Sequence, residues 1–448
     1  MYSAGVGVFL RKLIHILYAI AARMCSSGPD GGPGVYAFRA FRFERIKPSS
    51  TSRVPFPRSG HRIAADTANF YSFGGYNPLP RDYDRHGDDG EDAAERENGF
   101  LDGYWIQTLF QELWKFNYAS AEWTRYSNGD TMPMELASNA LLLHKNILMV
   151  YGGTGTPFGF RSSNQLYTCR VNDREGLMVE VNTTGQHPLP LYGQALIFYN
   201  DYLYTIGGTT GQAYTCDIHR LNLKSMNWEI VYICNGHGEY EPKGRYRHEV
   251  GFDGRNIYVL GGGTVTEAFD FKYIPAFDVE DLIWRRQKTV KDSNKGYPQP
   301  RRCHGAVQVN VDDNGGAPQV FVIGGHDGVN IFDDLWRLDL RTFQWTCFDT
   351  CRLPRPMYFH ATAVSPQGRL YVFGGNYSVN DDIRRTNAIY STWVCVPKLS
   401  EMCWEAVLHY NPNLNRCRSE ELINSGLPRH FVQRLGGFNN LNGRVKTE

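Results

Sequence analysis

The chain has 448 residues, enough for one large domain or for two or three ordinary ones. Hydrophobic residues make up 42% and aromatic residues 14%, which suffices for a large core. Lys and Arg together number 47 and Asp and Glu 46, so the chain lacks the basic excess typical of nucleic-acid binding. The 10 cysteines include no CxxC pair and no His/Cys spacing suited to zinc, which predicts reduced thiols and neither metal nor cofactor.

An apolar segment lies near the N-terminus, at residues 6–24. Arg11 and Lys12 interrupt it, so it is a poor transmembrane helix and no membrane partner is expected. The apolar run after this basic pair is also compatible with a signal peptide or an organelle-targeting peptide. We expect a disordered or helical leader over residues 1–36 and a cytoplasmic and nuclear protein. A secretory or organelle leader at residues 1–25 is the alternative.

Six apolar, strand-like runs that each end in a Gly pair recur along the chain. They are NFYSFGG (69–75), NILMVYGG (146–153), YLYTIGG (202–208), NIYVLGG (256–262), QVFVIGG (319–325) and RLYVFGG (369–375). A second short signature precedes them: RSGH (58–61), ELAS (135–138), LYGQ (191–194), RYRH (245–248), RRCH (301–304) and MYFH (357–360). A four-stranded unit of about 50 residues is typical of the kelch blade. The sequence therefore predicts an all-β, six-bladed kelch β-propeller with a short C-terminal helical appendage.

The sixth repeat lacks a fourth strand, because Pro397 directly follows its third strand-like run, NAIYSTWVCV (387–396). A stretch of suitable alternation, AFRAFRFERI, lies at residues 37–46. We expect residues 41–47 to supply the missing outer strand and so to close the ring. The propeller would then span residues 37–396, and residues 397–448 would form an appendage with a disordered end.

Blade geometry predicts which residues surround the central opening, because the segment before the first strand and the loop after the second share one face. The second signature residues are Ser59, Leu136, Tyr192, Tyr246, Arg302 and Tyr358. The residues after the Gly pairs are Tyr76, Thr154, Thr209, Gly263, His326 and Asn376. Arg245 and Arg301 begin their signatures and are expected at the same rim. This face is aromatic and cationic.

Such a face suits a carboxylate, which the forked donors of Arg hold, beside an apolar chain packed by Tyr. The predicted substrate-binding residues are Arg302, Arg301, Arg245, Tyr246, Tyr192, Tyr358, Ser59, Thr209, His326 and Asn376. The alternative is that signature residues join neighbouring blades, and it is favoured for Arg58, His61, His248, His304 and His360. An acidic segment at residues 81–102 leaves on this face as a solvated loop or as a screen for the arginines.

The C-terminal region changes to helical periodicity. One apolar stripe follows helical spacing: Leu399, Met402, Cys403, Ala406, Val407 and Tyr410. A second helix is expected from Ser419 as N-cap to Gly426, and a third from Pro428. These helices form either a lid packed on the propeller or a docking element for another protein.

Two short motifs in this tail resemble the docking boxes of ubiquitin-ligase receptors. LSEMCWEAV is similar to the elongin-binding BC box through Leu399, Cys403 and Val407, with Lys398 where a small residue or Pro is usual. LPRHFVQRL resembles the cullin-2 box, and its matching residues are Leu427, Pro428, Phe431 and Leu435.

Residues 55–435 as a whole resemble the kelch-repeat substrate receptors of elongin B/C–cullin-2 ubiquitin ligases. The matching stretches include RSGHRIAADTANFYSFGGYNP, GGTGTPFG, RRCH and TFQW. The resemblance implies a non-catalytic substrate receptor whose partners are elongin B, elongin C and cullin-2 with its RING subunit. It also implies that substrates bind through C-terminal tails that end in a small residue such as Gly.

Two other functions are compatible with a kelch propeller. A copper-radical oxidase would need Tyr and His ligands and a Cys that cross-links to a Tyr, and no suitable Cys stands among the rim positions. A kelch scaffold or signalling regulator that acts by binding alone would leave both tail boxes unexplained. No P-loop, GxSxG or HExxH motif indicates catalysis.

Overall fold

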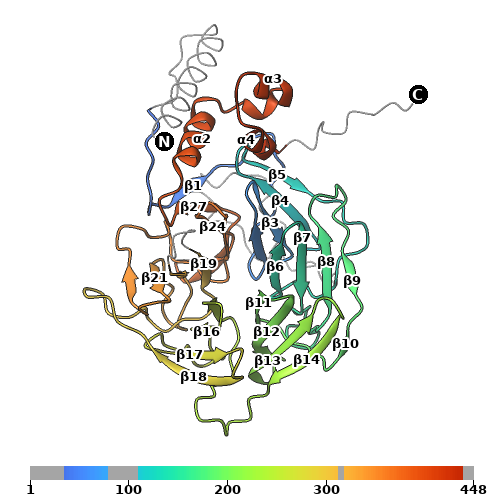
Figure 1. Cartoon of the computed structure of the whole chain (residues 1–448), viewed down its shortest axis with the longest axis vertical. Helices are drawn as coiled ribbons and strands as arrows, with labels where there is room; N and C mark the ends of the chain where they lie inside the picture. The colour runs from blue at the N-terminus through green and yellow to red at the C-terminus, as the bar shows by residue number, and fades with distance from the viewer. Residues whose placement is uncertain (1–34, 79–108, 311–316, 437–448) are drawn as a thin grey trace, which may run out of the picture.

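The computed structural model of the protein describes residues 35–78, 109–310 and 317–436. Six blades, each built on four antiparallel strands, are present. Figure 1 shows that they are arranged around one axis. The predicted six-bladed β-propeller is therefore confirmed. Residues 1–34 of the leader expected over residues 1–36, which include the apolar segment at 6–24, lie outside the described residues, as does the acidic segment at residues 81–102.

The first three blades follow the repeat order of the sequence. Blade 1 holds β2 (Arg62–Ala65), β3 (Asn69–Phe73), β4 (Leu113–Asn117) and β5 (Glu122–Arg125). Blade 2 holds β6 (Ala140–His144), β7 (Ile147–Tyr151), β8 (Leu166–Arg170) and β9 (Val179–Val181). Blade 3 holds β11 (Ala195–Tyr199), β12 (Tyr202–Thr209), β13 (Tyr214–Asn222) and β14 (Asn227–Tyr232), with β10 (Thr184–Gly185) added in parallel to β14.

The last three blades complete the ring. Blade 4 holds β15 (Glu249–Phe252), β16 (Asn256–Leu260), β17 (Tyr273–Asp278) and β18 (Ile283–Lys288). Blade 5 holds β19 (Gly305–Val309), β20 (Gln319–Ile323), β21 (Leu335–Asp339) and β22 (Trp345–Cys347). Blade 6 holds β23 (Ala361–Val364), β24 (Arg369–Phe373), β27 (Ile389–Trp393) and β1 (Glu44–Ile46), and carries a separate hairpin of β25 (Asn376–Val379) and β26 (Asp382–Arg385).

The strand that completes blade 6 comes from the N-terminal side of the chain. β1 pairs antiparallel with β27, with Glu44 opposite Ser391 and Ile46 opposite Ile389. It lies within the stretch expected from the sequence, residues 41–47. This pairing covers the outer edge of β27 and holds the two ends of the ring together.

The Gly pairs are required where neighbouring blades meet. Gly74 has φ +63°, and a Cβ there would lie 2.3 Å from the carbonyl oxygen of Leu136 in the next blade. Gly374 of blade 6 has φ +64°, and a Cβ there would lie 2.5 Å from the ring of His61 in blade 1. Any larger residue would push the blades apart, so the repeated Gly pair reflects blade packing.

Six backbone hydrogen bonds form a closed ring around the propeller axis. They run from N–H to carbonyl with lengths of 2.8–3.2 Å through one signature residue of every blade: Gly60, Phe359, Cys303, Arg247, Gly193, Ser138 and back to Gly60. Ser138 is the fourth residue of the blade 2 signature, which is offset by one residue, whereas the other five are third signature residues. All six residues have left-handed backbone angles, with φ between 52° and 70°. This ring brings the first strands of all six blades to the centre.

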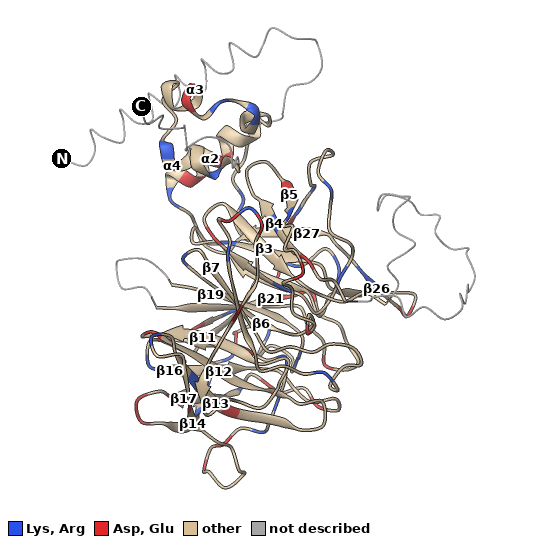
Figure 2. Ribbon diagram, turned by 90° about the vertical axis from the view of Figure 1, so that its right-hand side faces the viewer, with Lys and Arg blue, Asp and Glu red and all other residues tan. Residues whose placement is uncertain are grey.

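The C-terminal helices form a compact appendage at one edge of the disc, which Figure 1 and Figure 2 both show. They are α2 (Leu399–Tyr410), η1 (Leu414–Arg416), α3 (Ser419–Asn424), α4 (Arg429–Val432) and η2 (Gln433–Leu435). The N-cap of α3 is Arg418, one residue before the expected N-cap Ser419, which is the first residue of the helix. Pro428 is the N-cap of α4 and not, as expected, its first helical residue. None of the described helices has the length and apolarity needed to cross a membrane.

Candidate functional site

The structure brings the two predicted sets of rim residues together in pairs. Each pair forms a single antiparallel bridge: Ser59–Tyr76, Tyr192–Thr209, Tyr246–Gly263, Arg302–His326 and Tyr358–Asn376. In blade 2 the pair is Ala137–Thr154, so the prediction of Leu136 was wrong by one residue. Leu136 is buried because it packs into the core between blades 1 and 2.

The prediction that Arg245 and Arg301 reach the open rim was wrong. The side chain of Arg301 is fully buried and forms an ion pair with Asp334, with Nη1 and Oδ1 2.5 Å apart. Arg301 also donates to the carbonyl of Gly324 at 3.0 Å, and Arg245 donates to the carbonyl of Gly261 at 3.0 Å. In both blades, the first Arg of the signature therefore donates a hydrogen bond to the first Gly of the Gly pair in the same blade.

Arg58 and His61 have the structural roles that the sequence favoured for them. Arg58 is buried and donates to Glu112 at 2.7 Å, in the same arrangement as Arg301. Nε2 of His61 donates to the carbonyl of Phe373 in blade 6 at 3.1 Å. In blade 3, Gln194 takes the place of this histidine. These contacts join neighbouring blades and leave Arg58 and His61 unavailable to a ligand.

Arg302 lies between blades 4 and 5 and is only 8% exposed. Its Nη1 donates to the carbonyl of Thr264, and its Nε is buried without an acceptor among the described residues. The neighbouring ring of His326 lies 4.5 Å from that of Tyr358. Burial and the charge of Arg302 lower the pKa of His326 to about 4, so this imidazole is neutral at pH 7.

The other predicted tyrosines form a second group across the rim. The rings of Tyr192 and Tyr246 are 6.2 Å apart and nearly perpendicular, and both are half-buried. Burial raises the pKa of both phenols, which therefore stay protonated and can donate hydrogen bonds. Thr209 is buried, and its hydroxyl donates to Ala213 within its own loop. Thr209 thus shapes the loop and offers no donor to a ligand.

Arg247 was missed as a central residue by the sequence reasoning. Its backbone belongs to the hydrogen-bonded ring, and its side chain reaches across the axis to the hydroxyl of Ser138 and to the carbonyl of Gly60, 3.4 Å away. Burial, with the charge of Arg62 adding to it, lowers the pKa of Arg247 to about 10. The motif RYRH could have indicated it, since an arginine replaces the usual small third residue.

The hairpin β25–β26 was also missed, and it brings another arginine to the rim. Nε of Arg385 donates to the hydroxyl of Ser59 at 3.0 Å, and its guanidinium lies over the ring of Tyr76, 5.1 Å from the centroid. Asn380 and Asp381 form the turn, with φ of 50° and 68°. An Asn-Asp pair between two short strand-like runs is a hairpin signal that could have revealed it.

Exposed apolar side chains stand at the tips of the loops that follow the Gly pairs. Val265 in blade 4 and Val329 in blade 5 are 72% and 91% exposed. Phe158 in blade 2 is also exposed on one side and packs edge-on against Tyr76, with centroids 4.9 Å apart. These tips add apolar surface around the predicted rim.

The predicted elongin-binding residues lie on α2 in different environments. Leu399 is 52% exposed and Cys403 is half-buried, whereas Val407 is buried among the helices of the appendage. The inner face of α2 is formed by Trp404 and Val407. The helix is therefore packed on one side through Trp404 and Val407, and Leu399 is exposed at its first residue.

Most of the predicted cullin-binding residues form the core of the appendage. Leu427, Phe431 and Leu435 are buried, and Phe431 stacks on Trp404 with ring centroids 5.0 Å apart. Only Pro428 is partly exposed. The apolar stripe of the three buried residues faces α2, and the contact of all four with cullin-2 stays a prediction.

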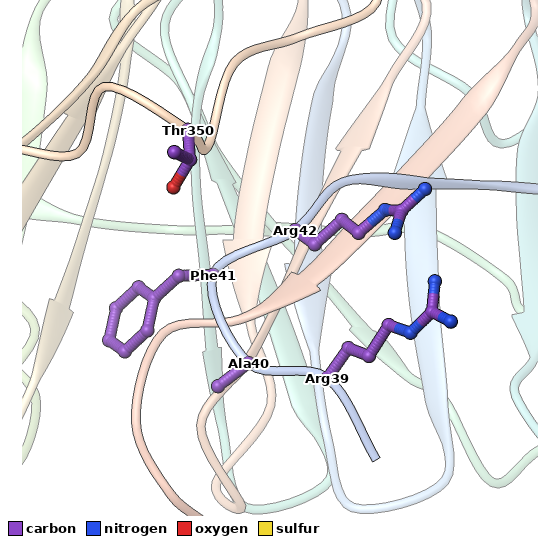
Figure 3. A pocket seen from close by; sticks show the side chains of 5 residues that line it. All are labelled: Arg39, Ala40, Phe41, Arg42 and Thr350. Atoms are coloured by element: carbon purple, nitrogen blue, oxygen red, sulfur yellow. The ribbon is translucent and has the colours of Figure 1, made fainter. Parts of the chain in front are cut away.

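Two surface hollows of about 470 Å³ lie beside the N-terminal segment, away from the predicted rim residues. Figure 3 shows one of them: Arg39 and Arg42 extend to one side of the backbone and Phe41 to the other. Phe41 stacks on Phe348 with centroids 4.4 Å apart, which anchors this segment to blade 5. Within the described residues there is no cluster of three or more His, Cys, Asp or Glu that could hold a metal.

Comparison with known proteins agrees with this architecture. The chain matches the KLHDC2/KLHL20/DRC7 Kelch-repeats domain over residues 101–314 and 237–413. The fold, the Gly pairs and this match define a kelch-repeat β-propeller, a class that typically serves as a non-enzymatic interaction scaffold; no catalytic family is indicated.

Curated relatives narrow the assignment. The chain is 40% identical over 419 residues to a Drosophila melanogaster protein, the Kelch domain-containing protein 10 homolog, covering 90% of this chain and 66% of that protein. It is 40% identical over 383 residues to Kelch domain-containing protein 10 of Xenopus tropicalis, covering 86% of each. The human protein of that name is 38% identical over 384 residues, covering 86% of this chain and 80% of the relative. The chain belongs to the Kelch domain-containing protein 10 family.

Proposed function

We propose that this protein is the substrate-recognition subunit of a cullin-2–RING ubiquitin ligase. The propeller face binds the substrate, and α2 binds elongin B/C. The observation that carries the proposal is the two-sided character of α2. Trp404 and Val407 fix the helix within the appendage, while Leu399 is left 52% exposed. An exposed apolar anchor on a rigidly held helix suits insertion into a groove of a partner.

The substrate is a protein whose C-terminal tail enters the propeller face. Three guanidinium groups on this face, those of Arg247, Arg302 and Arg385, form no ion pair with a carboxylate among the described residues. Uncompensated cations favour an anionic ligand, and a terminal carboxylate is present on every protein. Tyr192, Tyr246 and Tyr358 lie around this face, and we expect them to favour a small last residue, such as Gly.

The appendage links substrate and ligase. Elongin B/C binds at Leu399 and Cys403, and cullin-2 with its RING subunit binds beside α4. The buried cluster of Leu427, Phe431 and Leu435 supports this arrangement by fixing α4 relative to α2. The protein acts in the cytoplasm and the nucleus, and it contributes binding, not catalysis.

Co-precipitation of the full chain with elongin B/C tests the proposal. Leu399→Ala removes the exposed anchor and should weaken binding by about 2–4 kcal/mol, a loss of about thirtyfold or more. Leu189→Ala is the matched control, because Leu189 is an exposed leucine on the propeller, outside the appendage. Equal elongin recovery from both variants would overturn the proposal and leave a kelch scaffold that acts by binding alone.

A further inference from the structure

The N-terminal segment borders a hollow where the propeller meets the helical appendage. This hollow, here called the junction hollow, has a volume of about 470 Å³, and its wall includes residues of β1, of the turn between β4 and β5, and of α2. Its apolar lining includes Ala37, Ile46 and Leu408, and its wall also holds the ion pair of Arg369 and Glu405. None of the described residues that line it belongs to the predicted rim, so it is a separate site.

Two further arginines of this wall, Arg39 and Arg42, have no partner among the described residues. Neither forms a hydrogen bond or an ion pair there, in contrast to Arg369, whose Nη1 lies 2.5 Å from Oε1 of Glu405. Both are exposed, and Figure 3 shows that their side chains extend to the same side of the backbone. Like charges on one side repel each other, so an anion bound by both is favoured.

The carboxylates of the wall do not neutralise these two arginines. Glu405 is engaged by Arg369 and accepts further hydrogen bonds from Tyr36 and Trp393. Glu44 is exposed on β1 and forms no ion pair with a described residue. Residues 37–47 as a whole carry four cationic side chains and one carboxylate. The edge of the hollow is therefore basic, although the formal net charge of the whole chain is only +1.

The size and the lining of the hollow indicate what kind of ligand it accepts. A volume of about 470 Å³ is that of a site for a ligand of many atoms, and one small anion would leave most of it empty. An apolar wall beside two cations matches a peptide in which acidic and apolar residues lie close together. Contacts of Tyr36 with α2 and of Phe41 with blade 5 hold the segment on either side of Arg39, which lowers the cost of ordering it on binding.

We propose that the junction hollow binds an acidic peptide segment of a partner protein, with its carboxylates on Arg39 and Arg42 and its apolar side chains against the hollow's apolar lining. This site goes beyond the proposed ligase role and does not use the propeller face. It also leaves the exposed anchor of α2 free, because Leu399 and Glu405 lie about 120° apart around the helix axis at 3.6 residues per turn. A partner at Leu399 and a peptide in the hollow can bind together.

Fluorescence anisotropy with a labelled peptide tests the proposal on the full chain. The peptide has ten residues of Asp, Glu and Leu, and its C-terminus is amidated so that it presents no terminal carboxylate to the rim. A matched peptide carries Asn and Gln in place of Asp and Glu and should bind about tenfold more weakly. Arg39→Gln combined with Arg42→Gln should weaken binding of the acidic peptide about tenfold, since two partly exposed ion pairs are lost.

Two matched controls separate the hollow from general charge attraction. Arg416→Gln combined with Arg418→Gln removes two exposed arginines of the appendage that do not line the hollow, and it should leave binding unchanged. Ala37→Trp fills part of the hollow without a change of charge and should weaken binding about fivefold or more. Val35→Trp, at a 92% exposed residue outside the lining, should not.

Several results would overturn the inference. They are equal binding of the acidic peptide by the Arg39/Arg42 variant and the unsubstituted chain, an equal loss in the Arg416/Arg418 variant, and equal binding of the neutral peptide. Vesicles of phosphatidylserine and phosphatidylcholine that bind through Arg39 and Arg42, without peptide binding, would assign the site to a lipid surface instead. The peptide measurement needs no elongin, so it decides this inference whether or not the proposed ligase role holds. Loss of elongin B/C from the Arg39/Arg42 variant would show that the arginines support α2, which also overturns it.

Discussion

Arg369 of β24 and Glu405 of α2 form an ion pair with Nη1 and Oε1 2.5 Å apart, and it joins the propeller to the helical appendage. Glu405 also accepts hydrogen bonds from the indole of Trp393 at 3.1 Å and from the hydroxyl of Tyr36 at 2.9 Å. One carboxylate thus connects blade 6, the N-terminal segment and α2. This contact holds α2 against blade 6 and the N-terminal segment.

Glu405→Ala should loosen the appendage. Arg369 is largely buried and would lose its carboxylate, so we expect a loss of about 1–3 kcal/mol, less than for a fully buried pair. Limited proteolysis should cut residues 397–436 faster, and thermal melting should begin earlier. Glu420→Ala on the exposed side of α3 is the control. Equal cleavage of the two variants would show that the ion pair does not hold the appendage.

The cullin-2 surface should be separable from the core of the appendage. Phe431→Ala removes a ring stacked on Trp404 and should cost about 3–5 kcal/mol, with loss of both elongin B/C and cullin-2. Pro428→Ala combined with His430→Ala changes more exposed residues and should lose cullin-2 while keeping elongin B/C. Co-precipitation measures both partners. Undiminished cullin-2 recovery from the double variant would refute binding beside α4.

Arg301→Ala should reduce stability and not substrate binding as such. The substitution leaves Asp334 mostly buried without its cation, which should cost about 3–5 kcal/mol in the free energy of unfolding. Arg352→Ala breaks a more exposed pair with Asp333 and should cost less than about 1 kcal/mol. Urea unfolding distinguishes the two. Similar losses in both variants would contradict the structural role of Arg301.

The buried signature histidines should make stability depend on pH. Burial lowers the pKa of His248 to about 3 and of His360 to about 4, whereas an unfolded histidine titrates near pH 6.5. Between those values the unfolded chain binds more protons, so stability rises with pH and is lost as pH falls from about 6.5 towards 4. Each such histidine contributes up to about 1.4 kcal/mol per pH unit in this window.

His360→Gln tests this dependence, since Gln194 occupies the equivalent position in blade 3. The variant should lose less stability than the unsubstituted chain between pH 6.5 and pH 5. Urea unfolding at the two pH values measures the difference. An unchanged slope would mean that His360 is already protonated in the fold.

The sequence predicted the parts of the fold that repeat. Six Gly pairs defined six blades, because each pair permits a backbone contact that Gly alone can make, as at Gly74. The missing fourth strand of blade 6 predicted closure by the N-terminal segment, because an open edge needs a partner. Such features follow from periodicity and from backbone requirements, which a single sequence displays.

The side chains that line the candidate site could not be predicted in the same way. The sequence places Arg301 and Arg302 side by side, yet one is paired with Asp334 from a distant strand and the other faces Thr264 of the previous blade. Whether a cation is free depends on partners that come from other parts of the chain. Arg385 was missed because its hairpin interrupts the repeat, and the repeat was the guide to the rim.

The ring of six backbone hydrogen bonds and the side chain of Arg247, which crosses it, lie across the propeller axis. We infer that a peptide entering the central opening from the rim would not pass through to the opposite face of the propeller. An internal peptide segment would have to enter and leave through the same opening, so two lengths of chain would occupy it. A peptide terminus would occupy it with one length of chain. Under the proposed function, a preference for chain ends would therefore be set by this backbone ring. Changes in the rim side chains would then alter only which ends are accepted.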